Sequence, residues 1–285
     1  MQRLAAHFSA FKLSKMNILF IGGGNMAAAI IGGLVAKAWS PASIHAVDVL
    51  PEALARLERQ FGIRTSADAA AAAAGADCIV FAVKPQQMRD VATKVAPALN
   101  GQLIISIAAG IRCGDLARWL GPAARIVRAM PNTPALVAAG ITGLYAMKGV
   151  TAAQRRDAEH ILAAVGATFW VKQEGDLDAV TAVSGSGPAY VFYFIEALEQ
   201  AARDLGLPPE IARQSALATF AGAVKLAIAD DADPATLRAR VTSKGGTTER
   251  AIGVLDAAAV KAAFGRAVRA AAERAAEMGD TLGKD

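Results

Sequence analysis

Two glycine-rich turns, far apart in the chain, carry the clearest chemical signal. Val241–Thr248 reads Val-Thr-Ser-Lys-Gly-Gly-Thr-Thr, and Ile21–Ala27 reads Ile-Gly-Gly-Gly-Asn-Met-Ala. Glycine permits a positive φ, so successive backbone N–H groups in such a turn point at one spot, and a following helix adds its positive end. Each turn therefore predicts an anion-binding site. Together they predict an enzyme that brings a nucleotide and a second, smaller anion together.

The first turn has the spacing of a dinucleotide-binding turn. It follows the apolar run Asn17–Ile21 and precedes a helical pattern. In that context Gly22 makes the tight turn, Gly24 admits a pyrophosphate, and Ala27 lets the helix approach the strand. A tight strand–helix turn with no ligand is the alternative. The cofactor-binding residues predicted here, for NAD(H) or NADP(H), are Gly22, Gly24, Asn25, Met26 and Ala27.

Asp48 stands at the end of the second apolar run. An acid at this position accepts hydrogen bonds from the ribose hydroxyls of NAD and repels the 2′-phosphate of NADP, unless Arg56 or another base reaches it. A helix cap before Pro51 explains Asp48 equally well. The sequence therefore leaves the choice between NADH and NADPH open.

Three later segments end strands on the same rim of the predicted sheet: Ala82–Pro85, Ser106–Gly110 and Met130–Pro134. Lys84 is placed to approach the ribose or phosphates, and a solvated loop lysine is the alternative. Small residues on the rim leave room for a flat nicotinamide, whose amide Asn132 is placed to hold; alternatively, the prolines simply end a strand. The predicted cofactor contacts here are Ala82, Val83, Lys84, Pro85, Ala108, Ala109 and Asn132.

The sequence offers no side-chain set for proton transfer or for a metal ion. Its histidines, His7, His45 and His160, lie outside these turns, and neither a Ser–His–Asp order nor a metal-ligand spacing can be assembled. Hydride transfer to an already polarised C=N bond fits this absence, because such a site mainly needs to position two reactants.

Strand and helix patterns alternate through the first half of the chain. Strands are predicted at Asn17–Ile21, Ile44–Val49, Cys78–Val83, Leu103–Ile107, Ile126–Met130 and Ala167–Val171. Helices are predicted at Asn25–Ala38, Pro51–Gln60, Ala67–Ala74, Met88–Ala98 and, opened by a capping box, Thr151–Val165. Such alternation predicts an α/β, Rossmann-type domain with a mostly parallel sheet, at residues 16–175.

Only helical periodicity follows, which predicts an all-helical domain at residues 176–285. Its helices are predicted at Pro188–Leu205, Pro209–Ile228, Pro234–Val241, Thr248–Leu255 and Ala258–Met278. These 110 residues (176 to 285) are too few to bury their apolar faces well. Association with a second copy is therefore expected, with this half carrying the substrate and dimer contacts.

Composition narrows the class of protein. An apolar fraction of 54% with 19% charged residues indicates a well-buried globular chain, and two cysteines in apolar surroundings indicate no disulfide framework and a cytoplasmic location. The net charge of +5 comes from scattered residues, which argues against a nucleic-acid partner. The uncharged stretch Met16–Ala36 is broken by glycines, so no membrane span is predicted.

The first fifteen residues, Met1–Lys15, are basic and free of acidic side chains. We interpret them as a disordered extension, or as the result of a start codon assigned too early, rather than as a targeting peptide.

Six motifs together resemble pyrroline-5-carboxylate reductase, in the order seen in that family. The match runs from about Met16 to the C-terminus. The motifs are Phe20–Ala27, Ala82–Pro85, Ser106–Gly110, Arg128–Pro134, Ser184–Tyr190 and Gly245–Thr248. The resemblance departs at Lys244, where the family usually has proline, and the resulting loop is expected to be freer and more basic.

The resemblance implies the last step of proline biosynthesis, in which NAD(P)H reduces 1-pyrroline-5-carboxylate to L-proline. It also implies a Rossmann domain and a helical dimerisation domain, with dimers sometimes assembled into decamers. The substrate carboxylate would be held by the N–H groups of Gly246, Thr247 and Thr248 and by the Ser243 hydroxyl. Thr248 would bond or protonate the ring nitrogen, with solvent as the alternative proton source. The implied substrate-binding residues are Ser243, Gly245, Gly246, Thr247 and Thr248.

Two other functions compete with this reading. A β-hydroxyacid-type dehydrogenase would share both halves but needs a catalytic lysine, for which Lys225 and Lys244 are the candidates, neither with the expected partner asparagine. A non-catalytic dinucleotide sensor would need only the first half and would leave the Gly245–Thr248 turn without a role.

Overall fold

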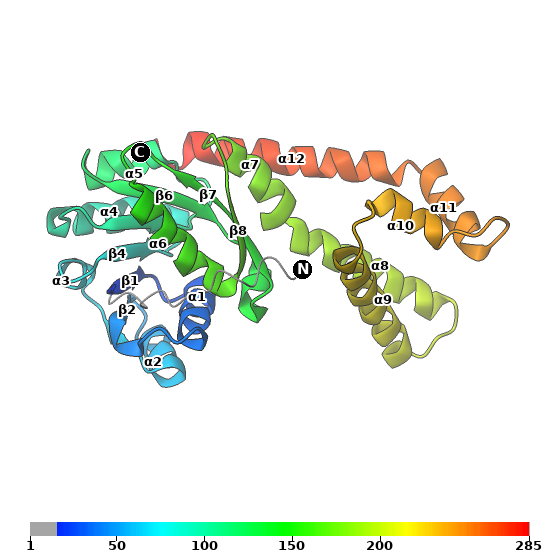
Figure 1. Ribbon diagram of the computed structural model, residues 1–285, viewed down its shortest axis with the longest axis horizontal. Coiled ribbons are helices and arrows are strands. Elements are labelled where there is room, and N and C mark those ends of the chain that lie inside the picture. The colour runs from blue at the N-terminus through cyan, green and yellow to red at the C-terminus, as the bar shows by residue number, and fades with distance from the viewer. Residues whose placement is uncertain (1–15, 285) are drawn as a thin grey trace. The chain divides into compact units, whose positions relative to one another are not determined.

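The computed structural model describes residues 16–284 of the chain (Figure 1). The predicted extension Met1–Lys15 lies outside these residues. The described chain forms two compact units: one runs to Gly185 and takes in the C-terminal residues from Ala272, and the other is Ser186–Ala271. The first unit extends ten residues (175 to 185) past the boundary predicted from sequence. The reason is that α7 (Asp176–Val180) contacts strands of the sheet and is followed by a π-helix, Thr181–Gly185.

An eight-stranded sheet forms the centre of the first unit, in the order β3-β2-β1-β4-β5-β6-β7-β8. Strands β1 to β6 are parallel, β7 runs antiparallel to β6, and β8 is parallel to β7. This confirms the predicted Rossmann-type, mostly parallel sheet. The strands are β1 (Ile18–Ile21), β2 (Ile44–Val47), β3 (Arg64–Ser66), β4 (Cys78–Phe81), β5 (Leu103–Ser106), β6 (Arg125–Met130), β7 (Gly140–Ala146) and β8 (Gly166–Trp170).

Both faces of the sheet are apolar, because the central strands are unbroken apolar runs and successive residues of a strand point to opposite faces. In β1, Ile18 and Phe20 join one hydrophobic cluster, whereas Leu19 and Ile21 join the other. A parallel sheet covered on both faces needs such continuous apolar strands, and these are the runs that the sequence shows.

Helices cover the two faces in separate layers (Figure 1). The first cluster contains residues of α1 (Asn25–Ala36), α2 (Pro51–Phe61) and α6 (Ala152–Leu162). The second contains residues of α3 (Ala69–Ala73), α4 (Met88–Val95) and α5 (Cys113–Leu120). The predicted capping box opens α6: the Thr151 hydroxyl accepts from the Gln154 N–H at 3.2 Å, and the Gln154 side chain accepts from the Thr151 N–H at 3.0 Å.

Besides α7 and the π-helix, the sequence analysis missed two strands and one α-helix of this unit. Strand β3 has only three residues, and α5 begins with Cys-Gly after an unusual cap, Arg112. Strand β7 contains two glycines, which weaken the signal of a strand. One of them, Gly143, is required by tertiary packing, because a Cβ there would lie 2.8 Å from Val180 Cγ1 of α7.

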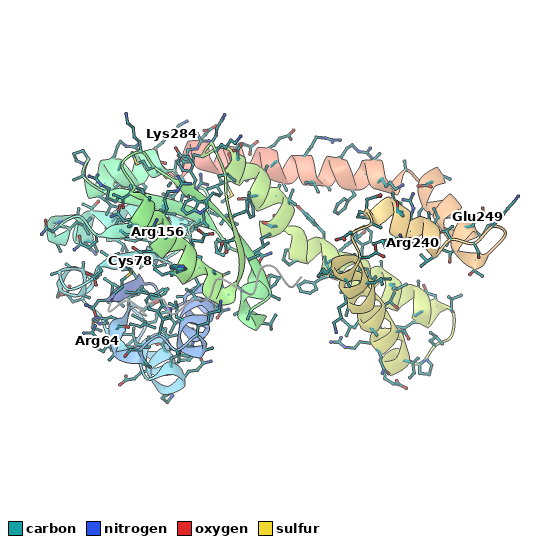
Figure 2. The ribbon with its side chains drawn as sticks, in the orientation of Figure 1. Arg64, Cys78, Arg156, Arg240, Glu249 and Lys284 are labelled. Atoms are coloured by element: carbon teal, nitrogen blue, oxygen red, sulfur yellow. The ribbon has the colours of Figure 1, made fainter. Side chains whose placement is uncertain are left out.

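The two cysteines are free and buried (Cys78 is labelled in Figure 2). Burial raises the pKa of both thiols, so they stay protonated at neutral pH and act as small apolar side chains.

The second unit consists of helices alone. They are α8 (Gly187–Asp204), α9 (Pro209–Ala229), α10 (Pro234–Arg240), α11 (Thr247–Ala257) and most of α12 (Val260–Thr281), whose C-terminal turns belong to the first unit. Among the described residues of α8 to α11, only Ala212 and Ala216 are buried. Many large apolar side chains, such as Phe192, Leu226 and Val254, are exposed instead. None of the helices described here has the length and apolar content needed to cross a membrane.

Candidate active site

A cavity of about 790 Å³ opens in the first unit at the carboxyl ends of β1, β2 and β4. Strand β1 lies between β2 and β4, where the strand order reverses, which is where open α/β sheets bind ligands. The cavity brings together six of the residues predicted from sequence: Gly22, Gly24, Asp48, Ala82, Val83 and Lys84.

Gly22 and Gly24 of the first turn are glycine for different structural reasons. Gly22 has a φ of +106°, and a Cβ there would lie 2.6 Å from the Ala82 carbonyl oxygen. Its N–H donates to the Val47 carbonyl at 2.7 Å, so the turn crosses tightly between two strand ends. Gly24 is exposed, and a Cβ there would meet no atom within 4 Å. Gly22 is therefore required by the fold, whereas Gly24 leaves an open approach to the start of α1.

Asp48 holds this turn in place as well as facing the cavity. One carboxylate oxygen accepts from the Gly23 N–H at 2.6 Å, and the other accepts from the Leu50 N–H at 2.9 Å. Arg56 completes the arrangement by donating to the Gly23 carbonyl at 2.8 Å. Asp48 thus orders the chain before α2 but is not its cap, because Leu50 is the N-cap residue and no side chain caps this helix. A carboxylate has further lone pairs, so its cavity side remains able to accept from a ribose hydroxyl.

Sequence reasoning missed about half of the cavity wall. The missed residues follow β2, lie around the start of α3, or lie on α4 and the turn before it. They include a second cation, Lys94, in the last turn of α4. Strand β3 was not recognised, so the start of the predicted helix Ala67–Ala74 was not expected at this rim of the sheet. The missed lining residues are Val49, Leu50, Ala67, Asp68, Ala69, Ala70, Gln87, Val91 and Lys94.

Other predicted contacts lie outside this cavity. Ala27 is buried, which suits a residue that lets α1 approach the sheet, and Asn25 lines a separate groove beside Arg56. Ala108 is buried next to Gly110, whose φ is +73°. A Cβ at Gly110 would lie 2.9 Å from Leu282 Cδ1, so the C-terminal residues pack directly on this rim. The predicted contacts outside the cavity lining are Asn25, Met26, Ala27, Pro85, Ala108, Ala109 and Asn132.

The second predicted anion site is a tight turn in the second unit. The Gly246 N–H donates to the Ser243 carbonyl at 3.0 Å, and Gly245 has a φ of +73°. These are the features of a type II β-turn, with Lys244 at its second position and glycine at its third. Helix α11 begins directly after it at Thr247.

The turn uses two of its own N–H groups, which changes the expected donor set. Gly246 donates within the turn, and Gly245 donates to the Glu249 carboxylate at 2.7 Å (Glu249 is labelled in Figure 2). In this conformation the Gly246 N–H, predicted to hold a carboxylate, closes the turn instead. Thr247 and Thr248 stand in the first turn of α11, where helical N–H groups have no partner within the helix. Gly246 provides no side-chain cap for them.

Comparison with known proteins decides the family. Residues 174–278 match the family model described as pyrroline-5-carboxylate reductase dimerisation, and residues 17–110 match NADP oxidoreductase coenzyme F420-dependent. The chain is 47% identical to pyrroline-5-carboxylate reductase of Pseudomonas aeruginosa, over 95% of this chain and 100% of that protein. The chain belongs to the pyrroline-5-carboxylate reductase family. The resemblance found in the sequence motifs is confirmed.

Solved structures of the family share the fold over nearly the whole chain. A pyrroline-5-carboxylate reductase from Coxiella burnetii is 42% identical with a TM-score of 0.89, and the match covers 93% of this chain and 99% of that one. The Plasmodium falciparum pyrroline carboxylate reductase with NADP bound is 30% identical with a TM-score of 0.84, over 93% and 98% of the two chains.

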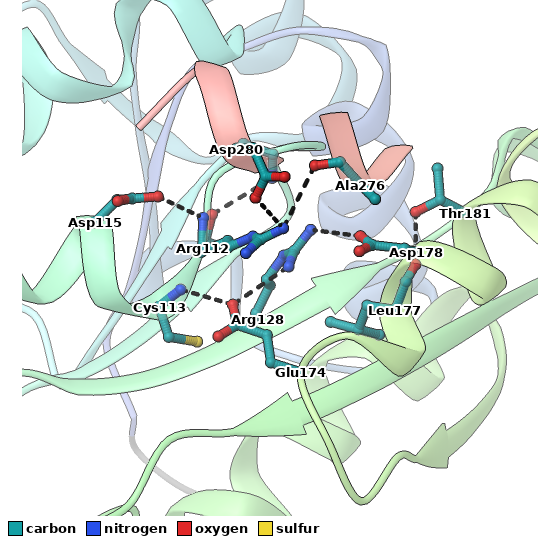
Figure 3. A network of polar contacts seen from close by, with 12 residues as sticks. Arg112, Cys113, Asp115, Arg128, Glu174, Leu177, Asp178, Thr181, Ala276 and Asp280 are labelled. Carbon is teal, nitrogen blue, oxygen red and sulfur yellow. Dashed lines mark hydrogen bonds and ion pairs between the residues drawn. The ribbon is translucent and has the colours of Figure 1, made fainter. Parts of the chain in front are cut away.

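The family motif Arg128–Pro134 begins with a buried ion-pair network (Figure 3). The Arg128 side chain is only 5% exposed and lies 3.3 Å from a Glu174 oxygen and 3.9 Å from Asp178 Oδ1. The same Glu174 oxygen accepts from the Cys113 N–H at 2.7 Å. Arg112 continues the network to Asp280 of α12 at 2.8 Å. The network joins β6, α5, α7 and the end of α12 within the first unit.

Asp178 is the least satisfied member of this network, since its Oδ1 is buried without a hydrogen bond among the described residues. Burial raises the pKa of its carboxyl, while Arg128 and Arg112 oppose that shift. A carboxyl with a raised folded-state pKa binds its proton more tightly in the folded protein. The free energy of unfolding therefore rises as the pH falls from the folded-state pKa towards the ordinary value.

Asp178→Asn is expected to remove this pH dependence. At neutral pH the change in stability should stay below about 1.5 kcal/mol, because Arg128 keeps Glu174 as a partner. Between about pH 7 and pH 4 the parent should gain stability relative to the variant. Urea unfolding followed by circular dichroism tests this, with Asp176→Asn at the exposed start of α7 as the control. Parallel pH curves for the parent and Asp178→Asn would contradict it.

Lys244→Pro is expected to stabilise the chain by about 0.4–1 kcal/mol, because proline suits the second position of a type II turn and restricts the unfolded state. The Lys244 N–H makes no hydrogen bond among the described residues, so none is lost. Urea unfolding measures the gain, and Lys244→Ala separates the effect of the ring from that of the charge. Loss of stability in the proline variant alone would show that the turn is not of this type.

Proposed function

We propose that this chain reduces 1-pyrroline-5-carboxylate to L-proline with hydride from NAD(P)H, the last step of proline biosynthesis. The observation that carries the proposal is the pair of anion-binding turns, Ile21–Ala27 and Ser243–Thr248, in a chain of this reductase family. One suits a dinucleotide pyrophosphate and the other a small carboxylate. The chain matches the pyrroline-5-carboxylate reductases of Pseudomonas aeruginosa and Vibrio alginolyticus along nearly their whole length, which supports the same assignment.

The cofactor belongs in the cavity of the first unit, whose residues fit a dinucleotide. The open side of Gly24 and the start of α1 suit the pyrophosphate, with Asn25, Met26 and Ala27 in the first turn of that helix. Asp48 is assigned to the adenosine ribose, and Lys84 to a ribose or phosphate. The rim residues Ala82, Val83, Pro85, Ala108, Ala109 and Asn132 are assigned to the nicotinamide side. When bound, NAD(P)H supplies the hydride.

The substrate carboxylate is assigned to the turn of the second unit. Thr247 and Thr248 offer their first-turn N–H groups, and the Ser243 hydroxyl lies beside Gly246. Gly245 and Gly246 shape the turn rather than supply its main donors. Arg238, Arg240 and Arg250 lie nearby in the sequence and bias the local field towards anions.

Thr248 is assigned the proton step. Its hydroxyl hydrogen-bonds or protonates the ring nitrogen, which makes the imine carbon more electrophilic as hydride arrives. A threonine hydroxyl is a weak acid, so a proton relayed from solvent through this hydroxyl is part of the proposal. Ser184–Tyr190 is assigned to the opposing wall of the site.

We assign the protein to the cytoplasm, and its helical unit to a homodimer interface, with a decamer as the larger assembly. Support for the interface comes from the dimerisation model matched by residues 174–278 and from the large apolar side chains that the helices leave exposed. Sedimentation of the purified chain measures the assembly.

An NADPH-oxidation assay tests the activity. The proposal expects turnover with 1-pyrroline-5-carboxylate and none when 3-hydroxyacids are offered with NADP⁺ or NAD⁺. Oxidation of 3-hydroxyacids alone would favour a hydroxyacid dehydrogenase. Cofactor binding without turnover of either substrate would favour a dinucleotide sensor.

Asp48→Ser is expected to raise the efficiency with NADPH relative to NADH by about tenfold. Losing one charged hydrogen bond to the ribose is worth about 1.5 kcal/mol, which corresponds to roughly that factor. Steady-state kinetics with both cofactors measure the ratio of kcat/KM. Asp90→Ser, which removes an exposed acid of α4 outside the cavity, controls for net charge. An unchanged ratio would show that Asp48 serves only the Gly23 turn and does not contact the ribose.

A further inference from the structure

The side chain of Asn132 joins three segments of the first unit. It is 8% exposed, just after β6, and its Oδ1 accepts from the Ile141 N–H of β7 at 2.9 Å. Its Nδ2 donates to the Ser184 carbonyl at 3.0 Å. The Ile141 donor identifies which end of the amide is the oxygen, so the nitrogen must face Ser184. Two of the bonding positions of the amide are therefore engaged by backbone groups.

The Ser184 carbonyl needs such a donor because the sequence lacks the usual helical one. In an α-helix its partner would be the N–H four residues later, and Pro188 stands there with no N–H. Ser184 lies in the π-helix Thr181–Gly185, a rare conformation that is frequent at functional sites. The Asn132 amide supplies the hydrogen bond that Pro188 cannot.

Packing brings the same two segments together. A Cβ on Gly185 would lie 2.7 Å from Met130 Cε, so the end of β6 lies directly against the end of the π-helix. Further along β6, Arg128 holds Glu174 and Asp178 at the start of the same helical segment (Figure 3). The segment from Glu174 to Gly185 is thus held from β6 at both ends.

We propose that Asn132 is a positioning residue that fixes the Ser184 carbonyl, and through it the end of the π-helix Thr181–Gly185 that leads into α8. This inference rests on the proposed function, in which Ser184–Tyr190 forms one wall of the substrate site. This positioning role is distinct from the nicotinamide contact expected for Asn132, because Ile141 and Ser184 each engage one bonding position of the amide and so fix its orientation.

Asn132→Asp tests the proposal with a nearly isosteric side chain. The introduced carboxyl still accepts from the Ile141 N–H, but when ionised it places an acceptor against the Ser184 carbonyl. We expect kcat to fall by about 10–100-fold, in line with a small misplacement of a reacting group, with the Kd for NADPH unchanged. At lower pH the carboxyl is protonated and regains a donor, so the deficit in kcat relative to the parent should shrink. A purely structural defect would not follow this titration.

Thr151→Ala is the matched control, because it also removes one side-chain-to-backbone hydrogen bond from the first unit, at the start of α6. It should leave kcat unchanged at temperatures where both variants are folded. A lowered NADPH affinity in Asn132→Asp with unaltered kcat would overturn the proposal in favour of a cofactor contact.

Hydrogen exchange separates this inference from the proposed function. Peptides covering residues 181–190 should exchange faster in Asn132→Asp than in the parent or in Thr151→Ala, whether or not substrate is turned over. If the parent does not reduce 1-pyrroline-5-carboxylate but the segment still exchanges faster in Asn132→Asp, the positioning role is kept and the proposed function is rejected. Unchanged exchange in this segment would overturn the positioning role even if the enzyme is active.

Discussion

Thr248→Ala is expected to lower kcat by about 10²–10⁴-fold, the range for a lost general acid, while the affinity for NADPH stays the same. The reason lies in its place as the second residue of α11: the substitution removes the hydroxyl but keeps the backbone N–H that faces the proposed carboxylate. Steady-state kinetics give kcat, and fluorescence titration gives the NADPH dissociation constant.

Thr247→Ala is the matched control, since it removes the neighbouring hydroxyl from the same helical turn. The assigned role of Thr247 uses only its N–H, so this variant should keep most of the turnover. Thr248→Ser should restore much of the loss, because it returns a hydroxyl. Full turnover by Thr248→Ala would show that the hydroxyl has no chemical role and that solvent delivers the proton directly.

Gly246→Val is expected to raise KM for 1-pyrroline-5-carboxylate by at least about 100-fold without weakening NADPH binding. A Cβ at Gly246 would lie 2.5 Å from Ser243 Oγ and 3.1 Å from the Ser243 carbonyl oxygen, so valine must displace the hydroxyl and open the turn. Losing two hydrogen bonds to a charged carboxylate costs about 3 kcal/mol, which corresponds to about that factor.

Gly253→Val controls for a valine in the same helix, because a Cβ there meets no atom within 4 Å. It should leave KM near that of the parent. Substrate affinity that survives Gly246→Val would place the carboxylate elsewhere and reject the assignment of the Ser243–Thr248 turn.

The part of the fold that follows from short-range patterns was predictable from the sequence. The apolar run Asn17–Ile21 and its glycine turn predicted the first strand and α1, because an unbroken apolar run and a glycine-rich turn before a helix are local features. The capping box at Thr151 was predictable for the same reason. Strand β7 was not, because its glycines make sense only once Val180 of α7 packs on Gly143.

The candidate site, like the fold, was predictable from the sequence only where it depends on residues close together in the chain. The residue types and spacing predicted the cofactor class and the family, and they also predict two anion-binding turns, since a φ above zero and a helix start are encoded within a few residues. They left Asp48 with two explanations, and the structure shows that its carboxylate holds the Gly23 N–H across 25 residues of chain while facing the cavity.

Only the structure shows which polar groups are already engaged. Gly246 and Gly245 donate to the nearby Ser243 and Glu249, whereas Asn132 is engaged by tertiary contacts with Ile141 and Ser184. A sequence shows which donors and acceptors a turn contains, but each hydrogen bond also depends on the distance and angle to a partner elsewhere. The chemistry of this protein could therefore be predicted from its motifs, whereas the division of labour between binding and positioning residues depends on how the chain folds around them.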